Sequence, residues 1–399
     1  MTNKNVSGNV KALPIFLAFL CMGFGDVVGP LVSLAKDTFS LSNTMAQLLP
    51  FMGFIMFAIL SVPMGVYQDK KGKKFVLTVG LIIALVGLLV PIFNGMYGPK
   101  VAIESGSQYK FYVLLGSILL LGAGATILQV SGNPIMRDVS PEGKFSSNLS
   151  LGQSIKAVGS SLGFLLPPFV AKAFGMDWSI LFPIYALLIL VTLLWLRSTK
   201  IEEKKDPEAT PATFMSCLGL LGNPYVLMMV MAIFVYVGAE VSMSSGVPIL
   251  LKEHYGIEGV GLWLSWALFF LPILAGRLAG AAILRSVSAI KFLFITVIIA
   301  MVGIGFMYLG SQALTFAGIV LVGLGFANIF PLVFSIAIDK MPERSNEISG
   351  LMVMAIAGGA FIPPIWGAVA DATSELVGFL VPLACLVYIL FTAFANKKA

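Results

Sequence analysis

Four ionisable side chains interrupt long apolar stretches of the sequence: Asp26, Lys156, Glu240 and Arg277. A charge in an apolar environment is costly, so it normally faces a cavity or an opposite charge. Carboxylates in such places can take up and release a proton, whereas lysine and arginine can neutralise them or bind an anion. We therefore expect Asp26 to be a proton-binding site, with a permanent ion pair or a helix-packing contact as the alternative. Glu240 is expected to be a second proton or hydrogen-bond site, with a structural tie as the alternative.

Uncharged polar residues share helix faces in the same stretches. Gln153, Lys156 and Ser160 are spaced i, i+3 and i+7, and Gln129 and Asn133 are spaced i and i+4, so each set lies on one face of a helix. Amides offer hydrogen-bond donors and acceptors to a hydroxylated ligand, and they also bond between helices in a membrane. The two faces predict a polar cavity lined by Gln129, Asn133, Gln153 and Lys156, with inter-helix bonding as the alternative.

Aromatic residues could supply an apolar platform for the same ligand. Tyr236 precedes Glu240 by one helical turn, and Trp266 and Phe330 lie in two later apolar stretches. An aromatic ring packs well against the apolar face of a ring-shaped ligand. We expect Tyr236, Trp266 and Phe330 to contact the substrate, with Asn328 as a polar contact; core packing is the alternative.

The elements that must position these residues are membrane helices. The 399 residues are 58% hydrophobic and 11% charged, and the mean hydropathy is +0.97. Soluble proteins carry about 25% charged residues, so the excess apolar surface requires a bilayer. Apolar runs of about 20 residues without alternation favour helices over a β-barrel. The sequence therefore predicts an all-α integral membrane protein.

The apolar runs predict twelve transmembrane helices, at residues 11–35, 44–67, 74–95, 110–137, 146–172, 177–197, 222–251, 258–285, 290–310, 311–339, 346–370 and 374–396. Two long stretches around a charged loop occur twice, with Gly124 matching Gly325 and Asp138 matching Asp339. Both copies have the same orientation, which indicates two six-helix bundles related by a pseudo-twofold axis along the membrane normal. The expected parts are an N-terminal bundle at 1–196, a cytoplasmic linker at 197–221 and a C-terminal bundle at 222–399.

The basic residues indicate an orientation. The pI of about 9.1 and the net charge of +6 arise mainly from loops on the side that holds both termini. Cytoplasmic loops carry an excess of Lys and Arg, so we expect cytoplasmic termini and no nucleic-acid partner. Cys21, Cys217 and Cys385 are far apart, and the single histidine, His254, stands beside Glu253. This pattern predicts no metal site, no cofactor and no nucleophile–base pair of an enzyme.

The loop after the second span carries the pattern G-x-x-x-D-K-x-G-K-K, beginning at Gly65. Glycine at position 72 allows a tight turn, and the lysines hold the loop at the cytoplasmic face. The pattern resembles the loop signature of the major facilitator superfamily. The resemblance implies a conformational lock on the cytoplasmic side, formed by Gly65, Asp69, Lys70 and Gly72. Arg277, toward the cytoplasmic end of span eight, is expected to snorkel and to add a gate contact.

Further motifs narrow this resemblance. FVYVGAEVSMSSGVPILL in span seven, AGRLAG in span eight and GLGFANIFPLVFSIAIDK in span ten resemble the fucose–proton symporter family of the major facilitators, and the match covers nearly the whole chain. The resemblance implies secondary active uptake of a hexose or deoxyhexose with a proton, by alternating access between the two bundles. The family's usual proton-coupling residues are an aspartate in span one, matched by Asp26, and a glutamate in span four, where this chain has Gln129.

The glutamine leaves alternatives open, because it cannot take up and release a proton. A sodium-coupled or an uncoupled sugar facilitator is one alternative. Lys156 could be a counter-charge to Asp26, the partner of an acidic sugar such as a uronate or sialate, or a structural tie. Pairing favours the charged form of Asp26, and protonation of Asp26 would then release Lys156 for substrate. A drug exporter of the same fold is a further alternative.

The expected partners are a small-molecule sugar, a proton (with Na⁺ as the alternative ion) and the lipid bilayer. The expected location is the bacterial inner membrane, with the chain crossing it several times. The fold class implies a monomer.

Overall fold

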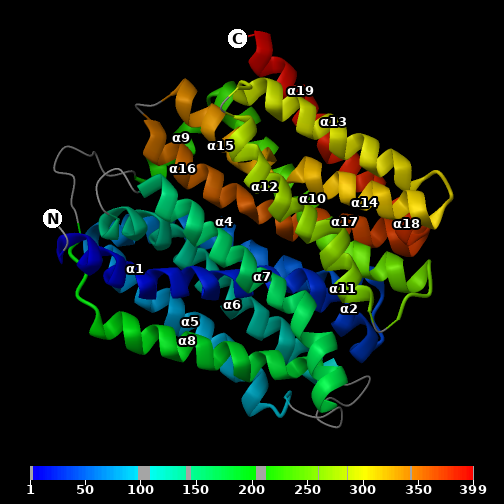
Figure 1. Cartoon of the computed structure of the whole chain (residues 1–399), viewed down its shortest axis with the longest axis horizontal. Coiled ribbons are helices and arrows are strands. Elements are labelled where there is room, and N and C mark those ends of the chain that lie inside the picture. The colour runs from blue at the N-terminus through cyan, green and yellow to red at the C-terminus, as the bar shows by residue number, and fades with distance from the viewer. Residues whose placement is uncertain are drawn as a thin grey trace. The chain divides into compact units, whose positions relative to one another are not determined.

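The computed structural model describes residues 3–97, 108–140, 145–203, 213–258, 260–284, 286–341 and 344–398, and in these ranges the regular secondary structure is helical (Figure 1). Twelve helical segments of the described residues are long and apolar enough to cross a membrane. The predicted all-α membrane fold and its number of spans are confirmed. The spans are Leu13–Phe39, Asn43–Gln68, Lys73–Phe93, Gln108–Met136, Leu151–Phe174, Trp178–Ser198, Pro224–Glu253, Gly261–Gly280, Ala289–Met307, Gln312–Lys340, Glu347–Ala372 and Glu375–Lys397.

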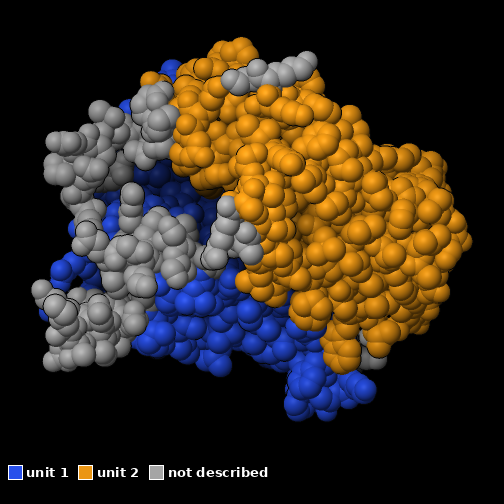
Figure 2. All heavy atoms as spheres, turned by 45° about the horizontal axis from the view of Figure 1, so that its top comes forward, with its two compact units in different colours: residues 1–28, 55–215 blue, residues 29–54, 216–399 orange. Residues whose placement is uncertain are grey.

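The chain forms two compact units, which Figure 2 colours separately. Unit 1 comprises Met1–Val28 and Ile55–Met215, and unit 2 comprises Gly29–Phe54 and Ser216–Ala399. The first half of the chain contains α1 (Asn3–Met22), η1 (Gly23–Val27), α2 (Val28–Phe39), α3 (Asn43–Ala46), α4 (Leu48–Lys71), α5 (Lys73–Phe93), α6 (Gln108–Val139), α7 (Phe145–Phe174), η3 (Trp178–Ile180) and α8 (Leu181–Ser198).

The second half begins with the short helix α9 (Phe214–Leu220), inside the segment predicted as a linker. It continues with α10 (Pro224–Glu253), α11 (Gly261–Ser265), η4 (Trp266–Phe270), α12 (Leu271–Ile283), α13 (Ala289–Met307), α14 (Gln312–Phe326), α15 (Ile329–Lys340), α16 (Ser345–Met354), η6 (Ala355–Ala357), α17 (Gly358–Ala372), α18 (Glu375–Gly378) and α19 (Leu380–Lys398).

The sequence duplication is visible in the packing of each unit. A Cβ atom added at Gly124 on α6 would lie 2.6 Å from Cβ of Ala84 on α5. At the matching position, a Cβ added at Gly325 on α14 would lie 2.7 Å from Cβ of Ala300 on α13. Small residues let helix backbones approach closely in membranes, where packing drives association. The same close helix pair therefore occurs once in each half of the sequence.

Several spans depart from regular α-helix, and three of them carry candidate site residues at or beside the irregular segment. Span one contains the 3₁₀ segment η1, and span eight contains the five-residue π-helical segment η4. Span ten is interrupted between α14 and α15, where Ala327 and Asn328 leave the helix. Such interruptions release backbone groups and frequently mark functional sites in membrane helices.

Residues 29–54 belong to unit 2, although the sequence assigns them to the N-terminal half. This segment holds α2, α3 and the start of α4, and it packs on α10 and α17. One close approach is at Gly29, where an added Cβ would lie 2.1 Å from Oγ of Ser244. The division into bundles at 197–221 stays a prediction, and the compact units follow a different boundary.

Candidate substrate and proton site

The first polar cluster lies in unit 1, where η1 meets α7. The backbones touch at two glycines: a Cβ added at Gly23 would lie 2.3 Å from the carbonyl oxygen of Lys156, and one added at Gly159 would lie 2.2 Å from that of Leu20. No larger residue fits either position without a backbone shift. This contact brings Asp26, on η1, beside the polar face of α7.

Asp26 and Lys156 form an ion pair at the centre of this cluster. Nζ of Lys156 lies 3.2 Å from Oδ2 of Asp26, and the two side chains are 21% and 33% exposed, respectively. Partly exposed charges within membrane spans must face a polar cavity, because contact with lipid would cost several kcal/mol. Of the three interpretations of Lys156 that the sequence left open, this geometry matches the counter-charge.

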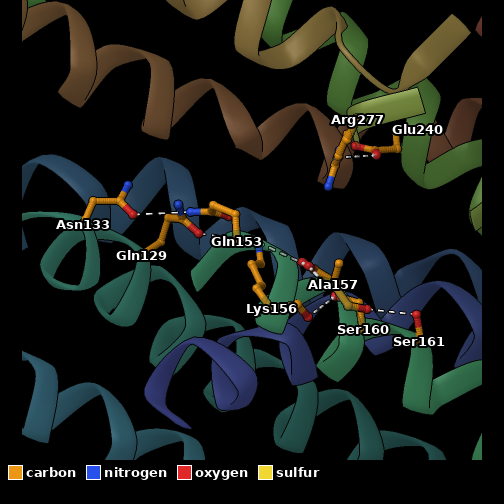
Figure 3. A network of polar contacts seen from close by, with 10 residues as sticks. Gln129, Asn133, Gln153, Lys156, Ala157, Ser160, Ser161, Glu240 and Arg277 are labelled. Atoms are coloured by element: carbon orange, nitrogen blue, oxygen red, sulfur yellow. Dashed lines mark hydrogen bonds and ion pairs between the residues drawn. The ribbon is translucent and has the colours of Figure 1, made fainter. Parts of the chain in front are cut away.

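The predicted amide residues adjoin the pair (Figure 3). Nζ of Lys156 donates to Oε1 of Gln129 at 3.4 Å, and Nε2 of Gln153 donates to Oδ1 of Asn133 at 3.3 Å. Gln129 and Asn133 come from α6, whereas Gln153 and Lys156 come from α7. The structure thus brings together all four residues predicted for the N-terminal wall, and their polar groups bond to one another.

Ser160 is a member of this cluster to which the sequence assigned no function. Its hydroxyl donates to Oδ2 of Asp26 at 2.9 Å and also lies 3.1 Å from the carbonyl oxygen of Lys156. The side chain is buried. Its helical register with Gln153 and Lys156 was visible in the sequence, but the proximity of η1 was not.

The second polar cluster lies in unit 2 and contains the other two intramembrane charges. Nη2 of Arg277 lies 3.6 Å from Oε1 of Glu240, and the side chains point toward each other (Figure 3). Nε of Arg277 donates to the carbonyl oxygen of Ala327 at 3.2 Å, at the interruption of span ten. Arg277, predicted as a gate residue, is therefore joined to the acid predicted as a second proton site.

The interruption of span ten is held by two further side chains. The hydroxyl of Tyr236 donates to the carbonyl oxygen of Phe326 at 3.0 Å, and Nδ2 of Asn328 donates to that of Gly276 at 2.8 Å. Tyr236 is fully buried and Asn328 is 5% exposed. Both side chains support the helix interruption from inside the packed unit. Their predicted contact with substrate stays a prediction.

The two remaining aromatic candidates are partly exposed. Trp266 opens the π-helical segment η4, and Phe330 follows the interruption of span ten. The ring of Phe330 stacks on that of Phe334, with centroids 5.9 Å apart. Exposed aromatic faces of this kind suit the apolar face of a ring-shaped ligand.

The predicted cytoplasmic lock is organised by a residue from the chain after α8. Gly72 has a φ of 94°, which favours glycine, and precedes α5. The carboxylate of Glu203 accepts from the backbone N–H of Lys73 at 2.7 Å and of Lys74 at 2.9 Å. The side chain of Asp69, the acidic member of the predicted lock, lies outside the described residues. Glu203 lies in the segment predicted as a cytoplasmic linker, and its capping contact could not be predicted from the sequence.

An ion pair fastens the same loop to α6. Nζ of Lys73 lies 2.6 Å from Oδ2 of Asp138, whose side chain is 1% exposed. Gly65 and Lys70, the other predicted members of the lock, lie in the last turns of α4, where Gly65 is half-buried and Lys70 is exposed. The bonds of Lys73 and Lys74 thus fasten the loop to other parts of unit 1 where α5 begins.

A third charged group, the rim cluster, consists of Lys36, Asp37, Lys252 and Glu253 in unit 2. Lys36 pairs with Glu253, and Nζ of Lys252 lies 2.5 Å from Oδ1 of Asp37. Two adjacent residues at the end of α2, one basic and one acidic, thus form two ion pairs with two adjacent residues at the end of α10. This cluster could not be predicted from the sequence, because both pairs join residues that are remote in the chain.

A further contact of residues 29–54 is made by Asp371, at the end of α17, which binds the start of α3. Its carboxylate accepts from the backbone N–H groups of Asn43 and Thr44, both at 2.8 Å, and from the hydroxyl of Thr44 at 2.7 Å. On α10, the hydroxyl of Ser245 donates to Oε1 of Gln47 at 3.1 Å. These bonds hold residues 29–54 on α10 and α17.

The described residues contain no group of three or more His, Cys, Asp or Glu side chains placed to hold a metal ion. The two polar clusters present ion pairs, hydroxyls and amides inside membrane helices. Each cluster lies beside an interruption of a membrane helix, η1 in span one and the break in span ten, as the substrate and ion sites of secondary transporters do.

The sequence matches the Major Facilitator Superfamily over residues 15–364, and the chain belongs to this superfamily. Its members are transporters, so the family assignment confirms the predictions of a multi-pass membrane protein and of a transporter in place of an enzyme. The chain is 27% identical to a glucose/galactose transporter of Brucella abortus, over 96% of this chain and 93% of the relative. It is 22% identical to the L-fucose-proton symporter of Escherichia coli, over 91% and 88% of the two chains.

Solved structures show the same fold. The structure of FucP, a major facilitator transporter in its outward conformation, matches with a TM-score of 0.69 and 19% identity, covering 98% of this chain and 99% of FucP. A bacterial homologue of the lysosomal transporter Spinster, inward-facing and occupied, matches with a TM-score of 0.69 and 16% identity, over 100% and 97% of the two chains. The predicted resemblance to the fucose–proton symporters is confirmed by these relatives.

Proposed function

We propose that this chain imports a neutral hexose or deoxyhexose by proton symport across the bacterial inner membrane, acting as a monomer with both termini in the cytoplasm. The observation that carries the proposal is the Asp26–Lys156 ion pair, 3.2 Å long and partly exposed within membrane spans. The relatives named as glucose/galactose transporters and fucose–proton symporters support the substrate class.

The ion pair provides a coupling step. With Asp26 deprotonated, its carboxylate holds the ammonium of Lys156 and accepts from Ser160. A proton on Asp26 removes the attraction, and Lys156 becomes available to donate to a sugar hydroxyl. The amides of Gln129, Asn133 and Gln153 can supply further donors and acceptors. Sugar therefore binds best to the protonated carrier, which couples the two fluxes.

The same pair argues against an acidic substrate. A lysine that is already neutralised by Asp26 attracts a uronate or sialate weakly, because the pair has no net charge. A neutral sugar needs donors and acceptors rather than a fixed positive charge. The acidic-sugar alternative thus has less support from this geometry than the neutral one.

The test is uptake into proteoliposomes of D-glucose, D-galactose and L-fucose against D-glucuronate, each with and without an inward proton gradient. We expect a neutral sugar to accumulate only with the gradient. The variant Asp26→Asn resembles the protonated carboxyl, so it should keep sugar exchange and lose accumulation. The proposal would be refuted if only glucuronate accumulated, or if uptake of neutral sugar were the same with and without the proton gradient.

A further inference from the structure

The ammonium group of Lys156 lies beside oxygen atoms from two different elements, and a hydroxyl from a third element bonds to one of these oxygen atoms. Nζ is 3.2 Å from Oδ2 of Asp26 on η1 and 3.4 Å from Oε1 of Gln129 on α6. Oγ of Ser160 on α7 lies 2.9 Å from that same Oδ2. Carboxylate, amide and hydroxyl oxygens are the ligands that hard cations take in proteins. The arrangement is that of a monovalent cation site whose cation is covalently tethered to the protein.

We infer that the oxygen atoms of Asp26, Gln129 and Ser160 form a sodium-type site that the Lys156 ammonium fills, so that Lys156 selects the proton as coupling ion. A second cation is excluded because the ammonium occupies the space and repels it. A proton adds directly to a carboxylate oxygen and needs no cage of ligands. The inference rests on the proposed function for its coupling part, whereas the cation site itself follows from the geometry.

The oxygen atoms of Asp26 and Ser160 are held in place without the lysine side chain. The tight backbone contacts at Gly23 and Gly159 hold η1 against α7 through main-chain atoms. Oγ of Ser160 is also placed by the carbonyl oxygen of residue 156, at 3.1 Å, which any residue at that position retains. Truncating Lys156 therefore removes the tethered cation and leaves a negatively charged, oxygen-lined space.

The inference predicts a gain of sodium binding. Lys156→Ala opens the space beside Asp26, whereas Lys156→Met removes the charge but keeps the space filled with an apolar chain. Melting temperatures of the purified protein in detergent are measured in NaCl, KCl and choline chloride at constant ionic strength. Sodium should raise the melting temperature of Lys156→Ala by ~2–4 °C at saturation. The wild type, Lys156→Met and the double variant Asp26→Asn/Lys156→Ala should show no sodium-specific shift.

Two results would overturn the inference. One is a Lys156→Ala protein that elutes as a single species, melts cooperatively and gives the same melting curve in all three salts. The other is a sodium-specific shift of the wild type, which would show that Lys156 does not exclude the ion. The wild-type measurement does not depend on the folding of any variant, and Lys156→Ser provides a second truncation.

Uptake measurements separate this inference from the proposed function. If wild-type uptake ignores the proton gradient while Lys156→Ala binds sodium, the coupling proposal fails and the cation site stands. If both hold, a sodium gradient should increase sugar accumulation by Lys156→Ala proteoliposomes and leave the wild type unchanged. If the wild type is proton-driven and Lys156→Ala never responds to sodium, only the cation site fails.

Discussion

The rim cluster gives the most direct test of how residues 29–54 are held on α10. We consider Lys252→Glu, which replaces the attraction between Lys252 and Asp37 by repulsion. The lost pair is partly exposed, with side chains 35% and 44% exposed, so its contribution is ~0.5–1 kcal/mol. Two like charges about 4 Å apart in a watery environment add a penalty of ~1 kcal/mol. The sum of ~1.5–2 kcal/mol corresponds to a roughly 10- to 30-fold shift toward separation.

The separation is measured by the labelling of an introduced cysteine. Ser245 is fully buried and bonds to Gln47 across the same contact, so Ser245→Cys reports when α3 leaves α10. The three native cysteines are buried and should react slowly. With the proposed cytoplasmic termini, the ends of α2 and α10 that carry the rim cluster face the periplasm, which is the outside of right-side-out vesicles. In such vesicles, a membrane-impermeant maleimide should label Ser245→Cys/Lys252→Glu about 10 to 30 times faster than Ser245→Cys alone.

Two controls separate this mechanism from a general loosening of the protein. The exchange Asp37→Lys/Lys252→Asp restores opposite charges and should restore slow labelling. Lys291→Glu makes the same charge change at an exposed position at the start of α13 and should have no effect. Two results would refute the idea that these pairs hold the contact closed. One is a labelling rate of Ser245→Cys/Lys252→Glu within twofold of that of Ser245→Cys. The other is fast labelling that persists in the variant with exchanged charges.

Three further predictions concern packing and burial. Gly159→Ala should lower the free energy of unfolding by ~1–3 kcal/mol, because its Cβ would lie 2.2 Å from a carbonyl oxygen of α1. Gly116→Ala is the control: no atom lies within 4 Å of its Cβ, so it should leave the melting temperature unchanged. Equal effects of the two substitutions would contradict the packing. Lys73→Met should lower the free energy of unfolding by about 3 kcal/mol, because the buried Asp138 carboxylate loses this partner. Adding Asp138→Asn removes the buried charge and should restore the stability. Absence of this rescue would contradict the pairing. Burial, with a smaller contribution from a nearby glutamate, raises the pKa of the Cys217 thiol. The reactive thiolate is therefore scarce at pH 7, and maleimide should label Cys217 much more slowly than an exposed cysteine. Equal labelling rates would contradict the burial.

Much of the candidate site in unit 1 could be predicted from the sequence. The spacing of Gln153, Lys156 and Ser160 places them on one helix face whatever the helix packs against. The same applies to Gln129 and Asn133. The high cost of intramembrane charge identified Asp26 and Lys156 as residues that need a partner, and their pairing was one of the alternatives. The role of Ser160 depended on the neighbouring element and could not be predicted.

The second polar cluster, in unit 2, was predicted less well. Glu240 and Arg277 were each recognised as functional candidates, but they were assigned to different tasks. Their ion pair depends on how closely α10, α12 and the interruption of span ten approach one another. No local pattern in the sequence reports that approach.

The sequence alone determined the membrane helices, their number, the duplication and the polar faces. These follow from hydrophobicity and helical periodicity, which are properties of neighbouring residues. The tertiary structure alone decided that Lys156 pairs with Asp26, that Arg277 pairs with Glu240, that Glu203 caps α5 and that residues 29–54 pack on α10. Each of these contacts joins residues far apart in the chain, and its formation depends on how the helix backbones pack, as at Gly23 and Gly159.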